Sequence, residues 1–247
     1  MLLERDQLTC GTTWHAAGLT QLRSNENIGK LAQYSAQLFH DLGQLTGHPT
    51  GFRQSGSITL ESTPARIEEL KRGASMGRSF GLEVEMIEQP KPKRVPLLDV
   101  SDVLGAAWIA SDGMTNPIDT AQAFAAGARQ GGAKLLERSA VTRIVTKKGQ
   151  FVGVETGEGW SAPRKRSSVP ACGVAAELVP LYAAQHLYVV TEAIPGLPAD
   201  LPTIRDMDAR VYAKLDAGLL RSACQAMGND ASPMISASIY CRMTLTI

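Results

Sequence analysis

The chain has 247 residues, of which 44% are hydrophobic and 20% charged, so it can bury one large core or two smaller ones. Lysine and arginine number 25 against 24 acidic residues, which excludes the strongly basic surface that binds nucleic acid or an anionic membrane. The four cysteines lie far apart, without the spacing of a metal site, which indicates reduced thiols in a cytosol-like compartment. No run of about 18 apolar residues predicts a membrane span, and no export signal is visible.

Strand and helix patterns begin at the first residue. Met1–Glu4 is typical of the end of a buried strand, with a carboxylate at its carboxyl end. Apolar positions with the helical period predict an amphipathic helix over residues 28–45. Residues 57–60 alternate like a strand, and Thr63-Pro64 supplies an N-cap and a first-turn proline for a helix that ends near Gly81.

The middle of the chain continues this alternation. Residues 82–87 and 105–109 read as strands, and Asn116-Pro117 opens an alanine-rich helix that ends at Gly131-Gly132. Residues 186–192 alternate again. Between this helix and residues 186–192, three short strands are predicted at residues 133–136, 141–145 and 151–155. A hairpin turn at residues 147–150 joins the last two. The predicted fold class is α/β with α+β, because strands alternate with helices while hairpins and proline-rich connections indicate an antiparallel element.

A dense run of small residues precedes the first helix: Thr9-Cys10-Gly11-Thr12-Thr13-Trp14-His15-Ala16-Ala17-Gly18-Leu19. Small residues let the backbone approach a flat or anionic ligand, with amides and hydroxyls free to hydrogen-bond it. Upstream, Glu4 is either a solvated strand-end residue or an acid that hydrogen-bonds the ribose of a dinucleotide.

Together, Glu4-Arg5 and the segment from Leu8 to Leu19 resemble the flavin-attachment segment of the dimethylglycine and sarcosine dehydrogenases. The similarity covers residues 2–160 and, more loosely, 180–220. It includes Gly51–Ser57, Thr63–Arg66, Asp112-Gly113, Pro117 and Ala125–Arg129. The resemblance implies a D-amino acid oxidase-like flavoprotein, with a glutathione-reductase-like FAD/NAD(P)-binding domain and an inserted antiparallel-sheet substrate domain.

The resemblance also implies the domain bounds. The FAD-binding domain is expected at residues 1–48 and 100–177, without its first strand and glycine-rich loop. The substrate-binding domain is expected at residues 49–99 and 178–220, followed by a divergent tail at 221–247.

The resemblance assigns the cofactor-binding residues. His15 matches the histidine that is joined covalently to FAD, since a neutral imidazole can attack the electrophilic 8α position of the flavin. Val141 matches the position whose backbone reads adenine, and Glu4 the ribose ligand. The remaining cofactor-binding residues are Arg5, Gly11, Thr12, Thr13, Ala16 and Gly173.

Two further segments match the substrate side. His186 and Tyr212 resemble the catalytic histidine and tyrosine of the family, where they would select and hold the unprotonated amine. A core histidine and a packed tyrosine are the alternative interpretations. Arg53 is either a ligand of the substrate carboxylate or a structural residue.

The implied activity is oxidation of an N-methyl amino acid, dimethylglycine or sarcosine-like, by hydride transfer to FAD with oxidative demethylation. The implied partners are this small molecule and an electron acceptor, either oxygen or an electron-transfer flavoprotein. The expected location is cytoplasmic, or the mitochondrial matrix in a eukaryote. Another amino-acid oxidase of the same superfamily is an alternative.

Departures from the family pattern favour a second alternative, a catalytically inactive fragment. The glycine-rich pyrophosphate loop has no counterpart in the chain, so the helix N-terminus that faces the diphosphate has none either. Three basic residues and Pro170 replace an apolar strand at residues 164–170, and the resemblance ends before Arg221.

Overall fold

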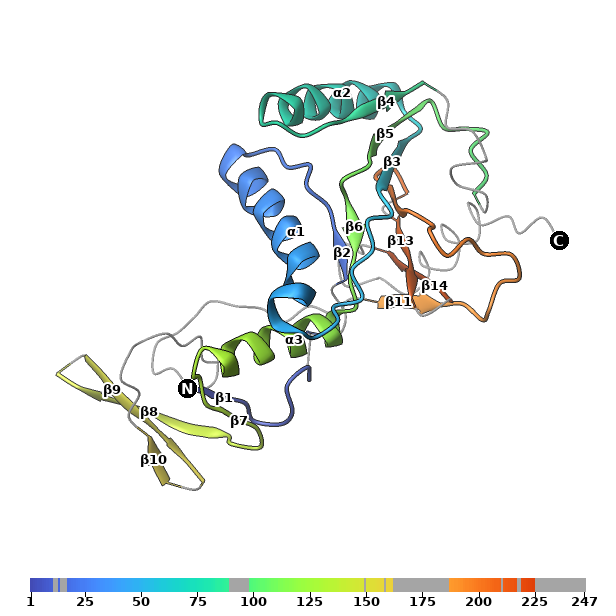
Figure 1. Ribbon diagram of the computed structural model, residues 1–247. Helices are drawn as coiled ribbons and strands as arrows, with labels where there is room; N and C mark the ends of the chain where they lie inside the picture. Colours follow the sequence, from blue (N-terminus) through green and yellow to red (C-terminus); the bar gives the residue numbers. More distant parts are fainter. Residues whose placement is uncertain are drawn as a thin grey trace. The chain divides into compact units, whose positions relative to one another are not determined.

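The computed structural model describes residues 1–10, 13, 17–88, 98–148, 150–157, 159–161, 187–209, 211–216 and 219–224. The chain divides into two compact units, each built from three separate stretches of sequence (Figure 1). The first unit comprises Met1–Ala16, Leu42–Thr50 and Asn116–Ala184, and the second comprises Ala17–Asp41, Gly51–Thr115 and Gln185–Ile247. The predicted bounds of the FAD-binding and substrate-binding domains stay predictions.

Helix α3, Pro117–Gln130, is capped as its sequence predicts. The Asn116 side chain accepts hydrogen bonds from the backbone N–H groups of Ile118 and Asp119. Pro117 occupies the first turn, where its missing N–H removes no intrahelical hydrogen bond. Gly131 is the C-cap residue. The predicted bounds of this helix are therefore confirmed.

The first unit also contains two small sheets. Strands β1 (Leu2–Leu3) and β7 (Leu135–Leu136) pair in parallel. Strands β8 (Val141–Lys147), β9 (Gln150–Thr156) and β10 (Gly159–Ser161) form an antiparallel sheet. The hairpin between β8 and β9 follows the prediction, whereas β10 was not predicted.

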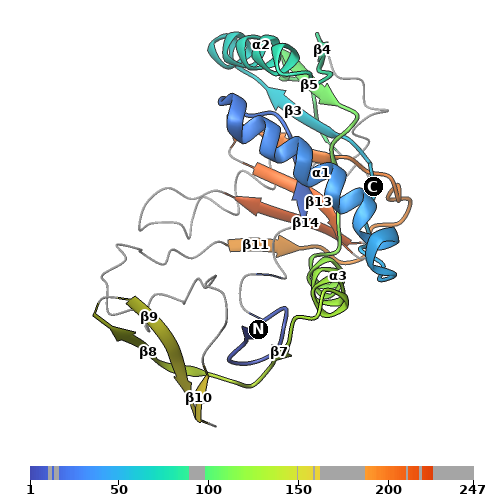
Figure 2. The ribbon, with the colours of Figure 1, turned by 60° about the vertical axis from the view of Figure 1, so that its left-hand side comes forward.

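A seven-stranded sheet forms the centre of the second unit (Figure 2). Its strand order is β11-β14-β13-β12-β3-β5-β4, and all neighbours are antiparallel except β12 and β3. The strands are β3 (Ser57–Glu61), β4 (Glu85–Ile87), β5 (Gly105–Ile109), β11 (Leu187–Val190), β12 (Thr203–Asp206), β13 (Val211–Asp216) and β14 (Leu219–Cys224). The predicted strand at 186–192 corresponds to β11, but the sequence did not predict β12, β13 or β14.

The two faces of this sheet differ in chemistry. One face is apolar and packs against Val103 and Leu201; its strand residues are Ile58, Leu60, Ala106, Ile204 and Ala213. On the other face, Ala107 and Ile109 pack against helix α2, Pro64–Ser79. Because side chains alternate along a strand, this second face also carries a polar row: Ser57, Thr59, Thr203, Arg205 and Tyr212.

Helix α2 begins differently from the prediction. Thr63 is the N-cap residue, but its side chain makes no capping hydrogen bond. Instead, the Asp208 carboxylate accepts hydrogen bonds from the N–H groups of Ser62 and Thr63, at 2.8 and 3.2 Å, and from the Thr63 hydroxyl. A residue distant in sequence therefore stabilises the start of this helix.

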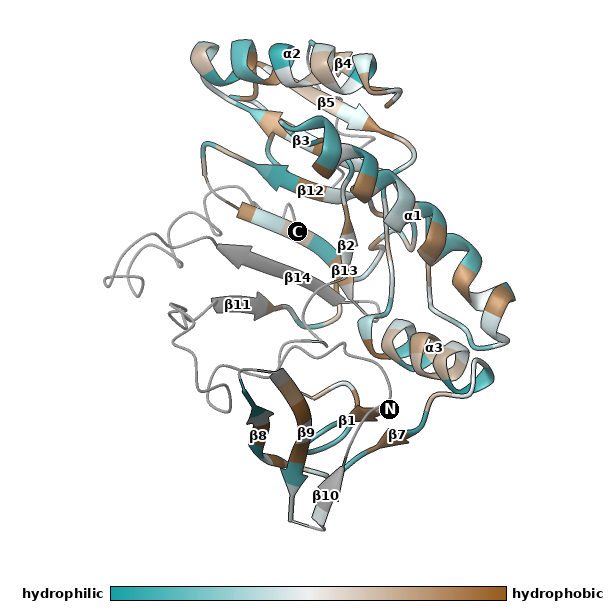
Figure 3. Cartoon of the chain, turned by 90° about the vertical axis from the view of Figure 1, so that its left-hand side faces the viewer, coloured by the Kyte–Doolittle hydropathy of each residue, from teal (hydrophilic) through white to brown (hydrophobic). Residues whose placement is uncertain are grey.

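Helix α1, Glu26–Thr46, confirms the predicted helix, and Figure 3 shows its hydrophilic and hydrophobic bands. Leu42 of the predicted apolar positions is buried, whereas Ile28, Leu31 and Leu45 are exposed. Two short strands, β2 (Gly18–Leu19) and β6 (Gly113–Met114), pair in the second unit. None of the described helices combines the length and apolar character that a membrane span requires. Within the same residue ranges, no group of His, Cys, Asp and Glu side chains is arranged to hold a metal ion.

Candidate functional site

The described cofactor candidates of the first unit surround the end of β1. Glu4 directly follows this strand, at the carboxyl end of the parallel β1–β7 pair. Its backbone carbonyl accepts a hydrogen bond from the Ser139 N–H at 2.8 Å, two residues before Val141 begins β8. Its carboxylate oxygen Oε1 accepts from the Asp6 N–H at 3.0 Å. The predicted ribose and adenine positions therefore belong to one local structure.

The chain after Glu4 runs along the segment after β7. The Arg138 N–H donates to the Asp6 carbonyl, and the Leu8 N–H donates to the Glu137 carboxylate at 2.6 Å. Arg5 forms an exposed ion pair with Asp6 at 2.9 Å, so its guanidinium already has an anionic partner. Its predicted role in cofactor binding stays a prediction.

Most residues predicted to contact the flavin or the substrate lie outside the part of the chain that the structure describes. The residues outside it are Gly11, Thr12, His15, Ala16, Gly173 and His186. Thr13 is described and exposed. Their predicted roles in FAD attachment and catalysis stay predictions.

Tyr212 lies against Gly18 in the second unit. A Cβ atom on Gly18 would overlap the Tyr212 hydroxyl oxygen and would lie 3.1 Å from Cζ of the same ring. Gly18 does not have a positive φ, so the space for the phenol, and not the backbone conformation, requires glycine here. The contact fixes one side of the phenol against β2.

Replacing Gly18 with alanine is expected to displace the Tyr212 ring and lower the free energy of unfolding by about 2 kcal/mol, the usual cost of overpacking. Tyr212→Phe removes the overlapping oxygen and should reduce that cost at least by half. Urea unfolding of both single variants and the double variant measures this coupling. Gly73→Ala is the control, because a Cβ there meets open space. Equal costs of Gly18→Ala in both backgrounds would contradict the contact.

A fully buried carboxylate holds the segment that carries Gly18. Asp112 Oδ1 accepts hydrogen bonds from the backbone N–H and side-chain amide of Gln21, both at 3.0 Å. Its Oδ2 accepts from the Ser57 hydroxyl at 2.6 Å. Burial raises the pKa of Asp112, while the hydrogen bonds from Ser57 and Gln21 oppose that shift. The sequence indicated only a turn at Asp112-Gly113, so this structural role was missed.

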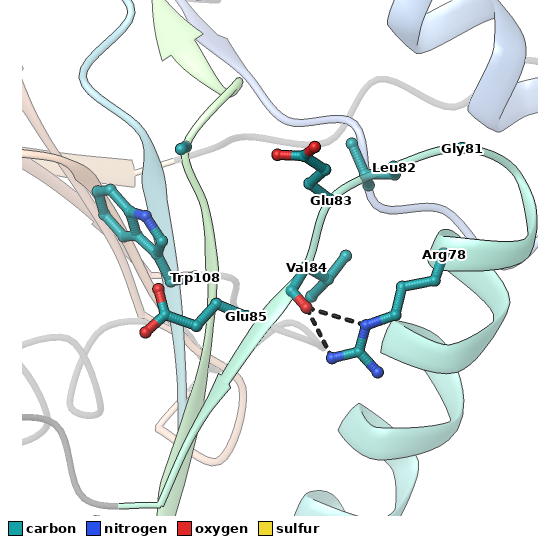
Figure 4. A pocket seen from close by; sticks show the side chains of 8 residues that line it. Arg78, Gly81, Leu82, Glu83, Val84, Glu85 and Trp108 are labelled. Carbon is teal, nitrogen blue, oxygen red and sulfur yellow. Dashed lines mark hydrogen bonds between the residues drawn. The ribbon is translucent and has the colours of Figure 1, made fainter.

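Arg53 and a surface cavity both belong to the second unit. The exposed Arg53 donates from Nη1 to the Ala199 carbonyl at 3.1 Å. A cavity of about 530 Å³ lies beside the loop between α2 and β4 (Figure 4). There, the Arg78 guanidinium donates to the Val84 carbonyl from Nε and Nη2. The lining residues are Arg78, Gly81, Leu82, Glu83, Val84, Glu85, Trp108 and Ala110, none of which the sequence proposed as functional.

The described residues fit the adenosine half of FAD. A carboxylate at the carboxyl end of a parallel strand is the group that holds the ribose hydroxyls in dinucleotide-binding folds, and Glu4 has this position. The backbone of Val141 lies in the adjoining segment. Glu4 and Val141 would therefore hold the adenosine, and FAD would supply the acceptor for a hydride.

Sequence comparisons identify several relatives of the chain. The chain is 35% identical to mitochondrial sarcosine dehydrogenase of Mus musculus over 250 residues, which cover 95% of the chain and 26% of that protein. It is 36% identical to mitochondrial dimethylglycine dehydrogenase of Homo sapiens, over 89% of the chain and 27% of that protein. It is also 33% identical to the mitochondrial pyruvate dehydrogenase phosphatase regulatory subunit of Mus musculus, over 87% of the chain and 26% of that protein. The chain thus spans about a quarter of the length of these relatives.

Solved structures share the fold. L-proline dehydrogenase from P. horikoshii superposes with a TM-score of 0.84 at 21% identity, covering 97% of this chain and 69% of that one. Glycine oxidase from Bacillus cereus gives a TM-score of 0.77 at 18% identity, covering 97% of this chain and 70% of that one. The predicted α/β and α+β fold class is confirmed by this likeness. The family profile described as FAD dependent oxidoreductase matches residues 1–239. The chain therefore belongs to the FAD-dependent oxidoreductase family.

Proposed function

We propose that the chain belongs to an enzyme that oxidises an N-methyl amino acid, such as dimethylglycine or sarcosine, with release of the demethylated amine and formaldehyde. The observation that carries this proposal is the 35–36% identity to sarcosine and dimethylglycine dehydrogenases across 89–95% of the chain. The mitochondrial relatives favour the mitochondrial matrix as its location in a eukaryote.

The chemistry requires an unprotonated substrate amine, because a protonated nitrogen has no lone pair to assist removal of hydride. When bound, FAD would supply the acceptor for a hydride from the N-methyl carbon, and water would then hydrolyse the resulting iminium to formaldehyde and the demethylated amine. The His186 imidazole is proposed to take the proton from the substrate ammonium. The Tyr212 hydroxyl is proposed to hold the resulting amine in place, and the half-buried position of Tyr212 against Gly18 supports this role. The electron acceptor is oxygen or an electron-transfer flavoprotein.

His15 is proposed to hold FAD covalently. If the full chain is loaded with FAD, precipitated with acid and washed, flavin fluorescence should stay with the native protein and be lost from His15→Ala. His48→Ala is the matched control, because the exposed His48 imidazole contacts the carbonyl of its neighbour Pro49 at 3.0 Å, and its backbone N–H, which alanine keeps, donates to the Thr46 hydroxyl. A native pellet without flavin, or a His15→Ala pellet that keeps it, would refute covalent attachment at this residue.

The proposed reaction is tested separately by anaerobic bleaching of the bound flavin with dimethylglycine or sarcosine, followed by assay of formaldehyde. Loss of flavin absorbance with formation of formaldehyde supports the activity. His186→Asn should slow bleaching most at low pH, where most of the substrate amine is protonated. Bound flavin that neither substrate reduces would contradict the proposed reaction.

A second candidate function is a flavoprotein subunit with a regulatory role and no amine oxidation. The identity of 33% to a relative named as a phosphatase regulatory subunit favours this candidate. Retention of flavin without substrate bleaching would support it over the first.

A further inference from the structure

Arg205 lies beside Tyr212 on the polar face of the seven-stranded sheet. The two residues are direct cross-strand partners of β12 and β13, and Thr59 of β3 is the partner of Arg205 on its other side. Directly opposed side chains in an antiparallel pair have Cβ atoms about 5 Å apart on the same face. Arg205 is also half-buried. The Arg205 side chain thus begins within reach of any small molecule that contacts Tyr212.

Among the described residues, no hydrogen bond or ion pair engages the Arg205 guanidinium. The neighbouring acids are directed elsewhere. Asp206 is on the opposite face of β12 and accepts from the Ala209 N–H at 2.7 Å. Asp208 accepts the hydrogen bonds at the start of α2. A partly buried guanidinium is normally paired, so Arg205 has unused capacity for an anion.

A second guanidinium increases the local positive charge. Burial, and then the positive charge of Arg205, lower the pKa of Arg23. Arg23 Nη1 donates to the Thr20 hydroxyl and the Leu22 carbonyl, both neutral groups. The nearby carboxylate of Asp112 already accepts from Gln21 and Ser57. The two arginines therefore repel each other, and a bound anion would relieve that repulsion.

The contacts of segment 18–23 explain how Arg23 reaches this place. Gly18 lies against Tyr212 of β13, while Gln21 is joined through Asp112 to Ser57 of β3. Strand β12, with Arg205, lies between β13 and β3 in the sheet. The segment therefore crosses the polar face over β12, and Arg23 follows Gln21 by two residues, near enough to Arg205 for its positive charge to lower the pKa of Arg23.

We infer that Arg205, assisted by Arg23, binds the carboxylate group of the substrate next to Tyr212. The identity of the substrate in this inference rests on the proposed function. A guanidinium and a carboxylate can form two parallel hydrogen bonds, which fixes the direction of the bound amino acid. Arg53, the arginine that the sequence suggested for this role, instead donates to the Ala199 carbonyl and is exposed.

The first test compares dimethylglycine with N,N-dimethylethylamine, which has a methyl group where dimethylglycine has its carboxylate. In the FAD-loaded full chain, Arg205→Gln should raise KM for dimethylglycine about 100-fold, the usual loss for a hydrogen-bonded charge. Its activity toward N,N-dimethylethylamine should stay within about twofold, because that amine has no group for Arg205 to bind. Arg53→Gln is the matched control and should leave KM for dimethylglycine unchanged.

The second test does not need turnover. Isovalerate has a CH group in place of the nitrogen of dimethylglycine, so it carries the carboxylate but cannot be oxidised as an amine. Titration with isovalerate labelled with ¹³C at the carboxyl carbon should show binding to the native chain that Arg205→Gln weakens at least about tenfold. The variant should melt at the same temperature as the native chain or higher, because one of two like charges is removed.

The outcomes separate the two proposals. Isovalerate binding that depends on Arg205, with no formaldehyde from any amine, would refute the proposed reaction and leave the carboxylate site standing. No isovalerate binding by the native chain, or weakening by Arg53→Gln and not by Arg205→Gln, would overturn the Arg205 site. Equal losses of activity toward both amines in Arg205→Gln would also overturn it.

Discussion

Replacing Asp112 with alanine is expected to lower the free energy of unfolding of the second unit by about 3 kcal/mol. The side chain is fully buried, and its two oxygens accept three hydrogen bonds from Gln21 and Ser57. Alanine would leave buried donors without an acceptor, and each such group costs about 1–3 kcal/mol. The loss would also release the segment between Gly18 and Arg23 from β3, and with it one wall of the proposed carboxylate site.

Urea unfolding followed by Trp108 fluorescence measures this effect. Trp108 lies in β5 and packs against the apolar core of the sheet, so its emission reports on the second unit. Trp14 and Trp160, the other two tryptophans, are replaced by phenylalanine in all samples. Asp112→Asn is the matched control: it keeps an acceptor for Gln21, and the Ser57 hydroxyl can rotate to accept from the new amide. A loss below about 1 kcal/mol in Asp112→Ala would contradict the account.

Glu61 is expected to make the stability of the second unit depend on pH near neutrality. Its side chain, at the end of β3, is 3% exposed, and Oε2 has no hydrogen-bond partner within the described part of the chain. Burial raises the pKa of Glu61 to about 7, and the negative charge of Asp208 adds to the shift. Asp206 and Glu69 act in the same direction, while Arg66 opposes them.

The sign of the effect follows from the raised pKa. Below the ordinary glutamate pKa of 4.5, Glu61 is protonated in both the folded and unfolded chain, and its contribution to stability is fully present. As the pH rises toward and through about 7, ionisation favours the unfolded chain and that contribution is lost. Glu61→Gln cannot ionise, so it should be more stable than the native chain by about 3 kcal/mol at pH 8. At pH 4.5 the two should unfold alike.

Urea unfolding at pH 4.5, 6, 7 and 8 with the same Trp108 reporter provides the measurement. Glu83→Gln is the control, because Glu83 is an exposed glutamate between α2 and β4 in the same unit. The free energy of unfolding of the Glu83→Gln variant should change with pH in parallel with that of the native chain. A Glu61→Gln curve that also parallels the native chain would show that Glu61 ionises normally in the folded protein.

Local sequence determined the elements whose interactions are themselves local. Helix α1 follows from its apolar period, and α3 follows from Asn116, Pro117 and the glycine pair after Gln130. In each case the capping group or the buried stripe lies within a few residues of the element it stabilises. The resemblance carried by the residues around His15 likewise identified the family, because a binding segment depends on its own side chains and small residues.

Tertiary structure alone decided the helix cap of α2 and the surroundings of Tyr212. Asp208 replaces Thr63 as the capping acceptor, although 145 residues separate them. Strands β12 to β14 were not predicted, because short strands gain their stability from pairing with neighbouring strands. The local pattern of apolar and polar residues does not contain that pairing.

The same physical reason distinguishes the proposed cofactor residues from the proposed carboxylate ligand. Residues 4 to 16 could be proposed from the sequence, because they form one continuous segment. Arg205 cannot be recognised from the sequence, because only strand pairing brings it beside Tyr212 and only the Gln21–Asp112–Ser57 hydrogen bonds hold the segment that carries Arg23 near this face of the sheet. Electrostatic repulsion between two guanidinium groups depends on their distance in space, and only the folded chain sets that distance.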